Sequence, residues 1–509
     1  MTEIVKKGLF QRMLDKVERA GNKLPQPVTL FVILVFFVLI ASWIFSMIGV
    51  SAVHPGSKEE IKAVNLLSGE GIQRIFVSMV KVFTDFPPLG LVLVVMIGIG
   101  VAERTGLIAA SLKAFVASVP SRLITFSIVT AGMLSSLAAD AGYVVLIPLG
   151  AAIFYGLGRH PLVGLAAAFA GVSGGFGANI FLTSLDPLIA AFTQPAARIV
   201  DPTYVVDATA NWYLMAASVP VVALAGTYVT EKIVEPRLGK YIGKVEEADD
   251  TPKELTHIER KGLRWAGISV LVTLAVIGYM FIPENGVLRG EDGSFSPFFT
   301  SIVALMLFVF FIPGLVYGLI TKSIKTDKEV AKMTADSMAS MGGYIVLSFA
   351  AAQFVAYFNW SNLGLIFAIS GADTLQNIGF TGIPLIVAFV IVSSIINIVI
   401  GSASAKWAIM APIFVPMLML MNPAFSPELT QAAYRIGDSY TNILTPLLPY
   451  FPLIIVFAQK YQKDIGIGTI ISVMLPYAIA FALVRIPMLI LWILFDIPLG
   501  PDAPLYYIP

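Results

Sequence analysis

Long apolar runs separated by short polar loops dominate the pattern of this chain. A transmembrane helix needs roughly 20 consecutive, predominantly apolar residues to cross the hydrocarbon core of a bilayer. The clear candidates are 27–49, 87–103, 211–230, 265–282, 298–320, 338–359 and 466–498. Two more regions, 161–200 and 426–460, are long enough to cross but are interrupted by glycine, asparagine, aspartate and proline. The pattern therefore predicts an all-α polytopic membrane protein with about nine transmembrane helices.

Two further stretches, 121–157 and 383–421, each hold two apolar halves around a small polar centre. Each half is too short to cross comfortably, so we interpret both stretches as re-entrant hairpins. Non-helical backbone at membrane depth is tolerated only where protein buries it or where it lines a water-filled cavity. Arg122 and Arg159 bracket the first hairpin, which we expect to open toward the cytoplasm, while the second opens outward. The alternative is two extra full spans, which would break the agreement between loop charge and span count.

Basic residues predict the orientation, because short loops rich in lysine and arginine remain in the cytoplasm. The N-terminal segment 1–26 and the loop 231–264 are strongly basic, and lysines also mark the loops around 322–332 and 460–463. The tail 500–509 contains no lysine or arginine. These charges predict a cytoplasmic N-terminus and an external C-terminus, which nine crossings also require.

The chain contains a weak internal repeat. Residues 141–149 resemble 405–413, and residues 179–183 resemble 442–445. Each half runs through a crossing, a linker, a hairpin, a broken crossing and a crossing, and the two hairpins open to opposite sides. This order predicts an inverted-topology repeat, an arrangement that places substrate and coupling-ion sites near the membrane midplane at discontinuous helices.

These elements divide the chain into consecutive parts, and the hairpin and broken helix of each half fall inside its repeat. The parts are a basic N-terminus (1–26), a first span with an external loop (27–86), repeat one (87–230), a cytoplasmic loop (231–264), two linking spans (265–335), repeat two (336–499) and an external tail (500–509).

Composition narrows the class of protein. Only 13% of the 509 residues are charged and 57% are hydrophobic, whereas soluble proteins carry about 25% charged residues. A net charge of +1 gives no reason to expect nucleic acid, and the absence of cysteine excludes disulfides and cysteine metal sites. His54, His160 and His257 are too far apart in the sequence to indicate a metal cluster. No nucleotide-binding loop or nucleophile–base set is apparent, so we expect neither an ATP-driven pump nor an enzyme.

Four ionisable residues stand out: Asp140 at the tip of the first hairpin, and Asp186, Arg435 and Asp438 in the interrupted apolar regions. A charge at the centre of a membrane helix costs roughly 2.5–3.5 kcal/mol on insertion scales, so such residues are functional candidates. Arg435 and Asp438 are three apart, so they share a helix face and can meet. We expect Arg435 to hold an anionic substrate group, and Asp438, with Asp186 and Asp140, to bind the coupling ion or proton. A structural ion pair is the alternative for Arg435 and Asp438, and a helix-terminus role for Asp140.

The tip of the second hairpin offers different chemistry. Small residues there would permit close backbone approach, and the oxygens of Ser402 and Ser404, with Asp438, suit a sodium ion; tight helix packing is the alternative. Asn397 is costly to bury unpaired, so we expect it to bind backbone or substrate. Trp407 offers a flat apolar surface to an aromatic ring, unless it is an ordinary core tryptophan.

Short segments distributed along nearly the whole chain carry a family resemblance. They are ERAGNKLP (18–25), GRHP (158–161), EPRLG (235–239), FNWSN (358–362), SAKW (404–407) and APIFVP (411–416). Together they resemble the p-aminobenzoyl-glutamate transporter (AbgT) family of the wider ion transporter superfamily, with Ala20 standing where that family often has isoleucine.

The resemblance implies a homodimer of nine-span subunits in the bacterial cytoplasmic (inner) membrane, each with two hairpins and a central cavity. It implies transport of p-aminobenzoyl-glutamate or export of sulfonamide antimetabolites, driven by a proton or sodium gradient and without a bound cofactor, and it gives Trp407 the aminobenzoyl ring as its partner. The family's site residues correspond here to Asp186, Asn397, Ser404, Trp407, Pro427, Arg435, Asp438 and Pro446.

Three alternatives to this function remain. A sodium-coupled dicarboxylate carrier of the same superfamily would be inhibited by succinate. A channel would show flux that is not coupled to a gradient, and an intramembrane enzyme would need a catalytic set that the sequence does not display. The residues leave import and export, and H⁺ and Na⁺, as open alternatives, because carboxylates serve both ions.

Overall fold

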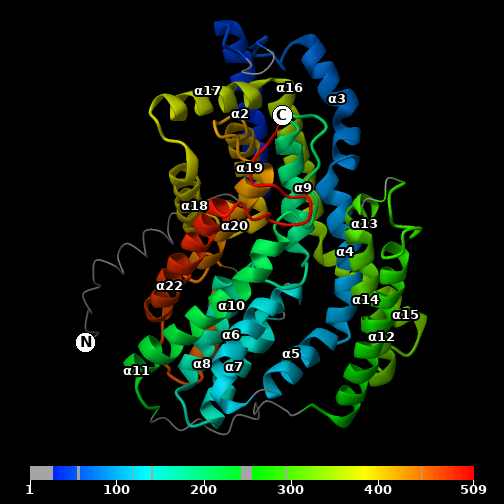
Figure 1. Ribbon diagram of the computed structural model, residues 1–509, viewed down its shortest axis with the longest axis vertical. Coiled ribbons are helices and arrows are strands. Elements are labelled where there is room, and N and C mark those ends of the chain that lie inside the picture. Colours follow the sequence, from blue (N-terminus) through cyan, green and yellow to red (C-terminus); the bar gives the residue numbers. More distant parts are fainter. Residues whose placement is uncertain are drawn as a thin grey trace.

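The computed structural model of the protein is mainly helical, and most of its helices run broadly along one long axis (Figure 1). It describes residues 27–53, 58–118, 120–138, 142–241, 255–291, 293, 295–448 and 450–508. The predicted N-terminus 1–26, the hairpin residue Asp140 and part of the loop 231–264 lie outside these residues. Within the described part, seven helices are long and apolar enough to cross a membrane, or eight if one bent pair counts as a single span.

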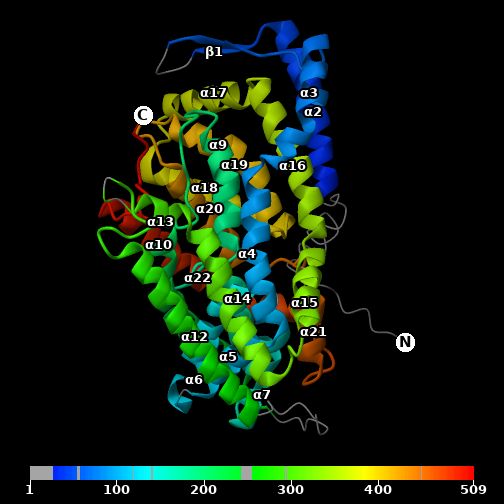
Figure 2. The same cartoon turned by 90° about the vertical axis from the view of Figure 1, so that its right-hand side faces the viewer.

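The first span is followed by more structure than its apolar pattern predicts. The elements are α2 (Pro27–Ile48), β1 (Ser51–Val53), β2 (Glu60–Lys62), α3 (Gly69–Thr84), α4 (Pro87–Arg104) and α5 (Leu107–Ala117). The antiparallel strands pair Ala52 with Ile61, and they lie beside α3 at one end of the molecule (Figure 2). The predicted external loop thus contains a strand pair and an amphipathic helix, which Ser68 caps by accepting from Gly71 N at 3.1 Å.

After α4 and α5, the first repeat continues mostly in short helices. They are a 3-10 turn (Ser121–Leu123), α6 (Ile124–Leu134), a 3-10 turn (Ser135–Ala138), a π-helical turn (Gly142–Leu146), α7 (Ile147–Gly156), α8 (Pro161–Phe169) continued by a π-helical turn (Ala170–Gly174), α9 (Leu185–Ala197) and α10 (Trp212–Val229). The 11 residues of α6 extend only about 16 Å, roughly half of the hydrocarbon core. The predicted broken crossing 161–200 is interrupted at 175–184, between the π-helical turn that follows α8 and the start of α9. Re-entry of the hairpin into the membrane stays a prediction.

A second group of helices stands to one side of the first repeat (Figure 1). It comprises α12 (His257–Phe281), α13 (Ser296–Thr300), α14 (Ile302–Thr321) and α15 (Asp327–Ser340); a π-helical turn (Thr230–Val234) and α11 (Glu235–Leu238) precede it. Helix α15 leads into α16 (Gly342–Trp360) with a bend of 44°, so the start of the predicted second repeat falls inside α15.

In the second repeat, the two helices of the predicted hairpin are longer than those in the first. It contains α17 (Leu363–Asn377), α18 (Gly382–Val399), α19 (Ala403–Met419), α20 (Pro427–Thr441), α21 (Phe451–Gln459) and α22 (Ile467–Leu494). Helix α18 is itself long and apolar enough to span, so the hairpin at 383–421 also stays a prediction. Helix α20 ends well before α21 begins, which leaves an interruption inside the region 426–460.

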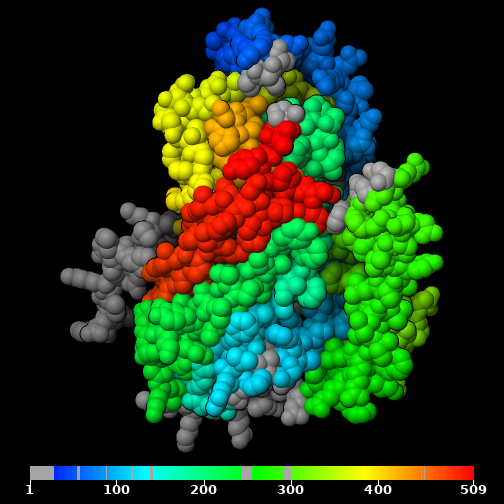
Figure 3. Space-filling view, in the orientation of Figure 1, coloured from blue at the N-terminus to red at the C-terminus, as the bar shows by residue number. Residues whose placement is uncertain are grey.

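The two interruptions lie side by side in the interior. Asn442, just after α20, donates from Nδ2 to the carbonyl of Ser173 at 3.5 Å. The packing there is close: a Cβ on Gly174 would lie 3.1 Å from Cδ1 of Ile443. The C-terminal tail covers the start of α20, where Ser426 N donates to Leu505 O at 3.0 Å (red in Figure 3). Polar side chains at the two interruptions, such as Asn179 and Thr445, are buried, so protein encloses them.

Candidate substrate and ion site

An ion pair joins the two broken helices. Arg435 Nη1, on α20, lies 2.7 Å from Asp186 Oδ1, in the first turn of α9. Asp186 Oδ2 also accepts from the backbone N and Oγ1 of Thr183, at 2.6 and 2.8 Å. Arg435 Nη2 donates to the carbonyl of Gly177 at 3.4 Å, where a φ of +82° favours glycine. Arg435 thus links α20 to the interruption of the first repeat through an ion pair and a hydrogen bond.

A second ion pair lies nearby and involves a residue that the sequence analysis did not single out as charged. Lys406 Nζ, on α19, contacts both Asp438 Oδ1 and Asn397 Oδ1. Asn397 Nδ2 donates to the carbonyl of Asp438 at 2.5 Å, and lies 2.8 Å from both Thr441 Oγ1 and Asn442 Oδ1. The ammonium is completely buried (0% exposed). The expectation that Arg435 and Asp438 meet is wrong for this structure, because each pairs with a residue from another helix.

A third buried cation, Arg485 on α22, reaches the same region. Its Nη1 donates to Ser439 Oγ, the residue after Asp438. Arg485 lies in the predicted span 466–498, and the sequence analysis overlooked it. Within the described part of the chain, the Nε atoms of Arg435 and Arg485 are buried without a hydrogen-bond partner.

The charges buried around the two helix interruptions do not cancel. Lys406, Arg435 and Arg485 carry three positive charges, and Asp186 and Asp438 carry two negative ones; all five residues are at most 4% exposed. The buried Glu428 lies seven residues before Arg435, about 10 Å along α20, and pairs with Tyr204 OH instead. A buried charge without a counter-charge is strongly unfavourable. Since guanidinium groups bind carboxylates and similar planar anions through paired hydrogen bonds, the free Nε donors and the excess charge favour an anionic ligand.

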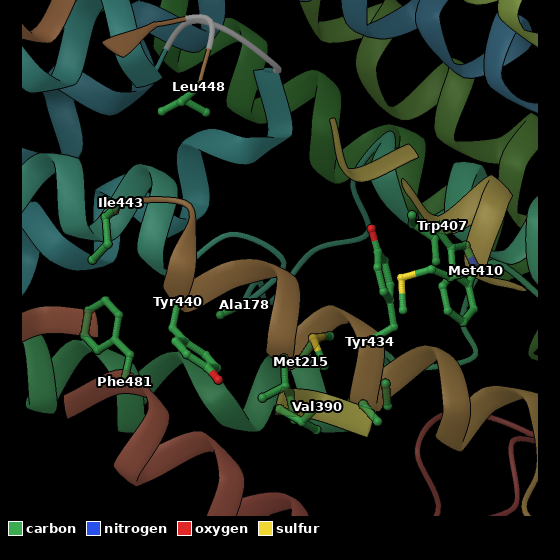
Figure 4. Packing of buried hydrophobic residues seen from close by; sticks show 14 of the residues in the cluster. Ala178, Met215, Val390, Trp407, Met410, Tyr434, Tyr440, Ile443, Leu448 and Phe481 are labelled. Carbon is green, nitrogen blue, oxygen red and sulfur yellow. The ribbon is translucent and has the colours of Figure 1, made fainter. Parts of the chain in front are cut away.

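The aromatic pair Trp407 and Tyr434 (Figure 4) adjoins the charged groups, since the Tyr434 ring centroid lies 5.6 Å from Lys406 Nζ. Trp407 stacks on Tyr434 with ring centroids 4.3 Å apart, and its Nε1 donates to Thr193 Oγ1 at 2.9 Å. The hydroxyl of Tyr434 donates to the carbonyl of Ala403 at 2.6 Å. Trp407 is therefore a fixed, fully buried ring, and Tyr434 covers one of its faces.

The remaining predicted residues lie at different places. Ser402 caps α19, with its Oγ accepting from Ala405 N and lying 3.4 Å from Ser404 Oγ. Pro427 begins α20 and is eleven residues from Asp438, about 16 Å along the helix, so the fold does not bring it to the ion pairs. Pro446 lies in the interruption between α20 and α21. Asp140 falls outside the described residues.

A polar chain that the sequence analysis did not find continues from Trp407 toward the end of α20 that the tail covers. Thr193 Oγ1 donates to Gln431 Oε1 at 2.6 Å, and Gln431 Nε2 donates to Asn211 Oδ1 at 2.8 Å. Asn211 Nδ2 donates to the carbonyl of Glu428, whose buried carboxylate accepts from Tyr204 OH, both at 2.8 Å. Burial, followed by the nearby Glu428 carboxylate, raises the pKa of Tyr204, which therefore remains a donor.

A large cavity of about 770 Å³ lies elsewhere, between α5, α10, α12 and α14. The molecular surface is hollowed between α10 and the α12–α14 pair (Figure 3). The walls of the cavity are mostly aliphatic and aromatic side chains such as Phe115, Leu274 and Phe310. None of the residues that line the cavity is charged. The anion-favouring charges are thus separate from this space.

Apolar helices of spanning length, together with two interrupted helices that bury charged groups between them, define a polytopic membrane transporter. The chain belongs to the AbgT putative transporter family, whose pattern matches residues 12–507. It is 39% identical over 504 residues to the p-aminobenzoyl-glutamate transport protein of Escherichia coli (strain K12), covering 98% of each chain.

Two solved structures are similar over nearly the whole chain. The YdaH transporter of Alcanivorax borkumensis is 42% identical, with a TM-score of 0.89, and the match covers 94% of this chain and 100% of that one. MtrF of Neisseria gonorrhoeae, described as illuminating a class of antimetabolite efflux pumps, is 48% identical, with a TM-score of 0.91 and coverage of 97% and 100%. The family resemblance, the transporter class and the mainly helical membrane fold are confirmed; the division into parts and the roles of individual site residues stay predictions.

Proposed function

We propose that this protein is an ion-coupled secondary transporter of anionic aminobenzoyl compounds in the bacterial inner membrane. The observation that carries the proposal is the uncompensated buried positive charge beside the Trp407–Tyr434 ring pair. p-Aminobenzoyl-glutamate combines an aromatic ring with carboxylates, and sulfonamide antimetabolites carry a similar ring. The names of the Escherichia coli relative and of the Neisseria gonorrhoeae pump support these substrates.

Each part of such a substrate has a complementary group. The guanidinium groups of Arg435 and Arg485 would bind a carboxylate or sulfonamide oxygen through their unused Nε donors. The rings of Trp407 and Tyr434 would contact the aminobenzoyl ring, since stacked aromatic pairs add about 0.5–1.5 kcal/mol beyond area burial. Asn397 and Ser404 would complete the polar contacts.

Access to the site requires movement, because the ion pairs and Trp407 are buried. In transporters with inverted repeats, one bundle rocks against the other around a fixed midplane site. We propose that the hairpin-bearing parts move against the remaining helices of a homodimer whose N-termini are cytoplasmic. Asp438 and Asp186 would exchange protons or bind sodium during this cycle.

The test is flux of labelled p-aminobenzoyl-glutamate in proteoliposomes, with proton and sodium gradients imposed separately. We expect gradient-driven flux in the parent, its loss in Asp438→Ala, and parental flux in Asp373→Ala, which removes an exposed carboxylate on α17. Equal flux in Asp438→Ala and the parent would remove Asp438 from the mechanism, and flux indifferent to both gradients would indicate a channel.

A sodium-coupled dicarboxylate carrier is the second candidate, because the excess positive charge fits any small carboxylate. The ring pair favours the aminobenzoyl substrate. Excess succinate in the same assay separates the two: succinate should leave p-aminobenzoyl-glutamate flux unchanged, and strong competition would support the carrier of dicarboxylates.

A further inference from the structure

Lys406 occupies the position that a coupling cation would take. Its ammonium contacts Asp438 Oδ1 and Asn397 Oδ1, which are the kinds of oxygen that bind a metal cation. A sodium ion at Asp438 would have to displace this tethered cation or share the carboxylate with it against repulsion. A proton has neither difficulty, because it adds to a carboxylate oxygen without needing a coordination shell.

The surroundings offer Lys406 one counter-charge. On α20, the Tyr434 ring lies 5.6 Å from Nζ, and the Arg435 charge is paired with Asp186 of α9. On α22, Arg485 adds a further positive charge through its bond to Ser439. Helix α18 contributes the neutral Asn397. Within the described part of the chain, Lys406 forms its ion pair with Asp438.

Neutralising Asp438 therefore leaves the Lys406 ammonium without a counter-charge. When a proton from water binds the Asp438 carboxylate, the ammonium keeps its own protons and loses its partner. Removing one member of a buried pair leaves an uncompensated charge and is strongly unfavourable. An incoming carboxylate would restore the pairing, so proton binding and anion binding favour each other. By linkage, each must strengthen the other by the same factor.

We propose that Lys406 couples proton binding to substrate binding: protonation of Asp438 releases the ammonium, which then pairs with the substrate carboxylate. This inference rests on the proposed function and specifies it further. The coupling ion is the proton, and proton and p-aminobenzoyl-glutamate cross in the same direction. On release of the substrate, Asp438 returns its proton to water and the Lys406–Asp438 pair forms again.

The experiment measures binding of p-aminobenzoyl-glutamate to the purified full-length protein across a pH series, with and without Na⁺, using radiolabelled ligand. We expect the parent Kd to fall as pH falls, by up to about tenfold per pH unit for one linked proton, and to change less than about twofold with Na⁺. Lys406→Met should bind more weakly, with a Kd independent of pH. Lys328→Met makes the same change at an exposed residue of α15, and it should bind as the parent does.

A second variant covers the case in which Lys406→Met leaves Asp438 unpaired and unfolds the protein. Lys406→Met/Asp438→Asn removes both charges, and replacing a whole buried pair by neutral groups is far better tolerated. Its Kd should also be independent of pH. If the Kd of either variant depended on pH as strongly as the Kd of the parent, the proposal would be overturned.

If neither variant binds measurably, the test rests on the parent protein. A parent Kd that is independent of pH, or that changes tenfold with Na⁺, would overturn the coupling role of Lys406. Absence of any binding or flux of p-aminobenzoyl-glutamate by the parent is a different result, and it overturns the proposed function as well.

Discussion

Replacing Arg435 with methionine separates substrate recognition from structural pairing. Methionine fills a similar volume but cannot donate a hydrogen bond or carry charge. In the folded protein, Arg435 holds Asp186 at 2.7 Å and keeps a buried Nε free. The substitution therefore removes a binding group for an anion and leaves the Asp186 carboxylate unpaired.

The two effects have different sizes. A hydrogen bond to a charged group is worth about 1.5–3 kcal/mol, which corresponds to a rise in KM of roughly 10- to 150-fold. Breaking a buried pair from one side destabilises a protein by about 3–5 kcal/mol, and the pair is at most 6% exposed. The double change Arg435→Met/Asp186→Asn should restore most of the stability and none of the affinity.

The assay combines flux of p-aminobenzoyl-glutamate in proteoliposomes with thermal unfolding in detergent, as a double-mutant cycle. Asp186→Asn alone is the matched control: it should destabilise the protein but raise KM less than Arg435→Met does, since Arg435 remains available. The reasoning is refuted if Arg435→Met has the parental KM, or if the double variant recovers affinity together with stability.

Other changes give independent tests. Gly437→Ala should lower both Tm and flux, because its Cβ would lie 2.4 Å from Val390 O, whereas Gly343→Ala, with nothing within 4 Å, should be tolerated in both assays. Tyr204→Phe leaves the Glu428 carboxylate without its phenolic donor and should destabilise by about 1–3 kcal/mol, measured as a lower Tm; an unchanged Tm would contradict the bond's importance. Burial, then the charge of Asp502, raises the pKa of Asp207 above 3.8, so the folded state holds the proton more tightly and the parent should lose stability as pH rises from 3.8 through the raised pKa. Asp207→Asn should lack this loss in a Tm series over pH, and identical pH profiles would contradict it.

The apolar pattern predicted the spans closely because lipid exposure imposes it on each helix separately. Helix α2 was expected at 27–49 and forms at Pro27–Ile48, and α10 was expected at 211–230 and forms at Trp212–Val229. Helix α3 and the β1–β2 pair were missed. Helix α3 is amphipathic, and β1 and β2 have three residues each, so none of them forms a long apolar run.

Charge in an apolar run identified Asp186, Arg435 and Asp438 as buried, and the structure buries all three. The same rule applies to Lys406 and Arg485, but Lys406 lies at a hairpin tip rich in small residues and Arg485 in an uninterrupted helix, so no break in the apolar pattern marked them. The partners could not be predicted, since spacing brought Arg435 and Asp438 to one face while packing gave them partners on other helices.

The most direct measurement is an experimental structure of the protein with p-aminobenzoyl-glutamate bound. The account predicts the ligand at the two helix interruptions, with a carboxylate on Arg435 or Arg485, its ring against Trp407 and Tyr434, and Lys406 turned from Asp438 toward the ligand. A ligand seated in the uncharged cavity between α5 and α14, with both buried ion pairs unchanged, would contradict it.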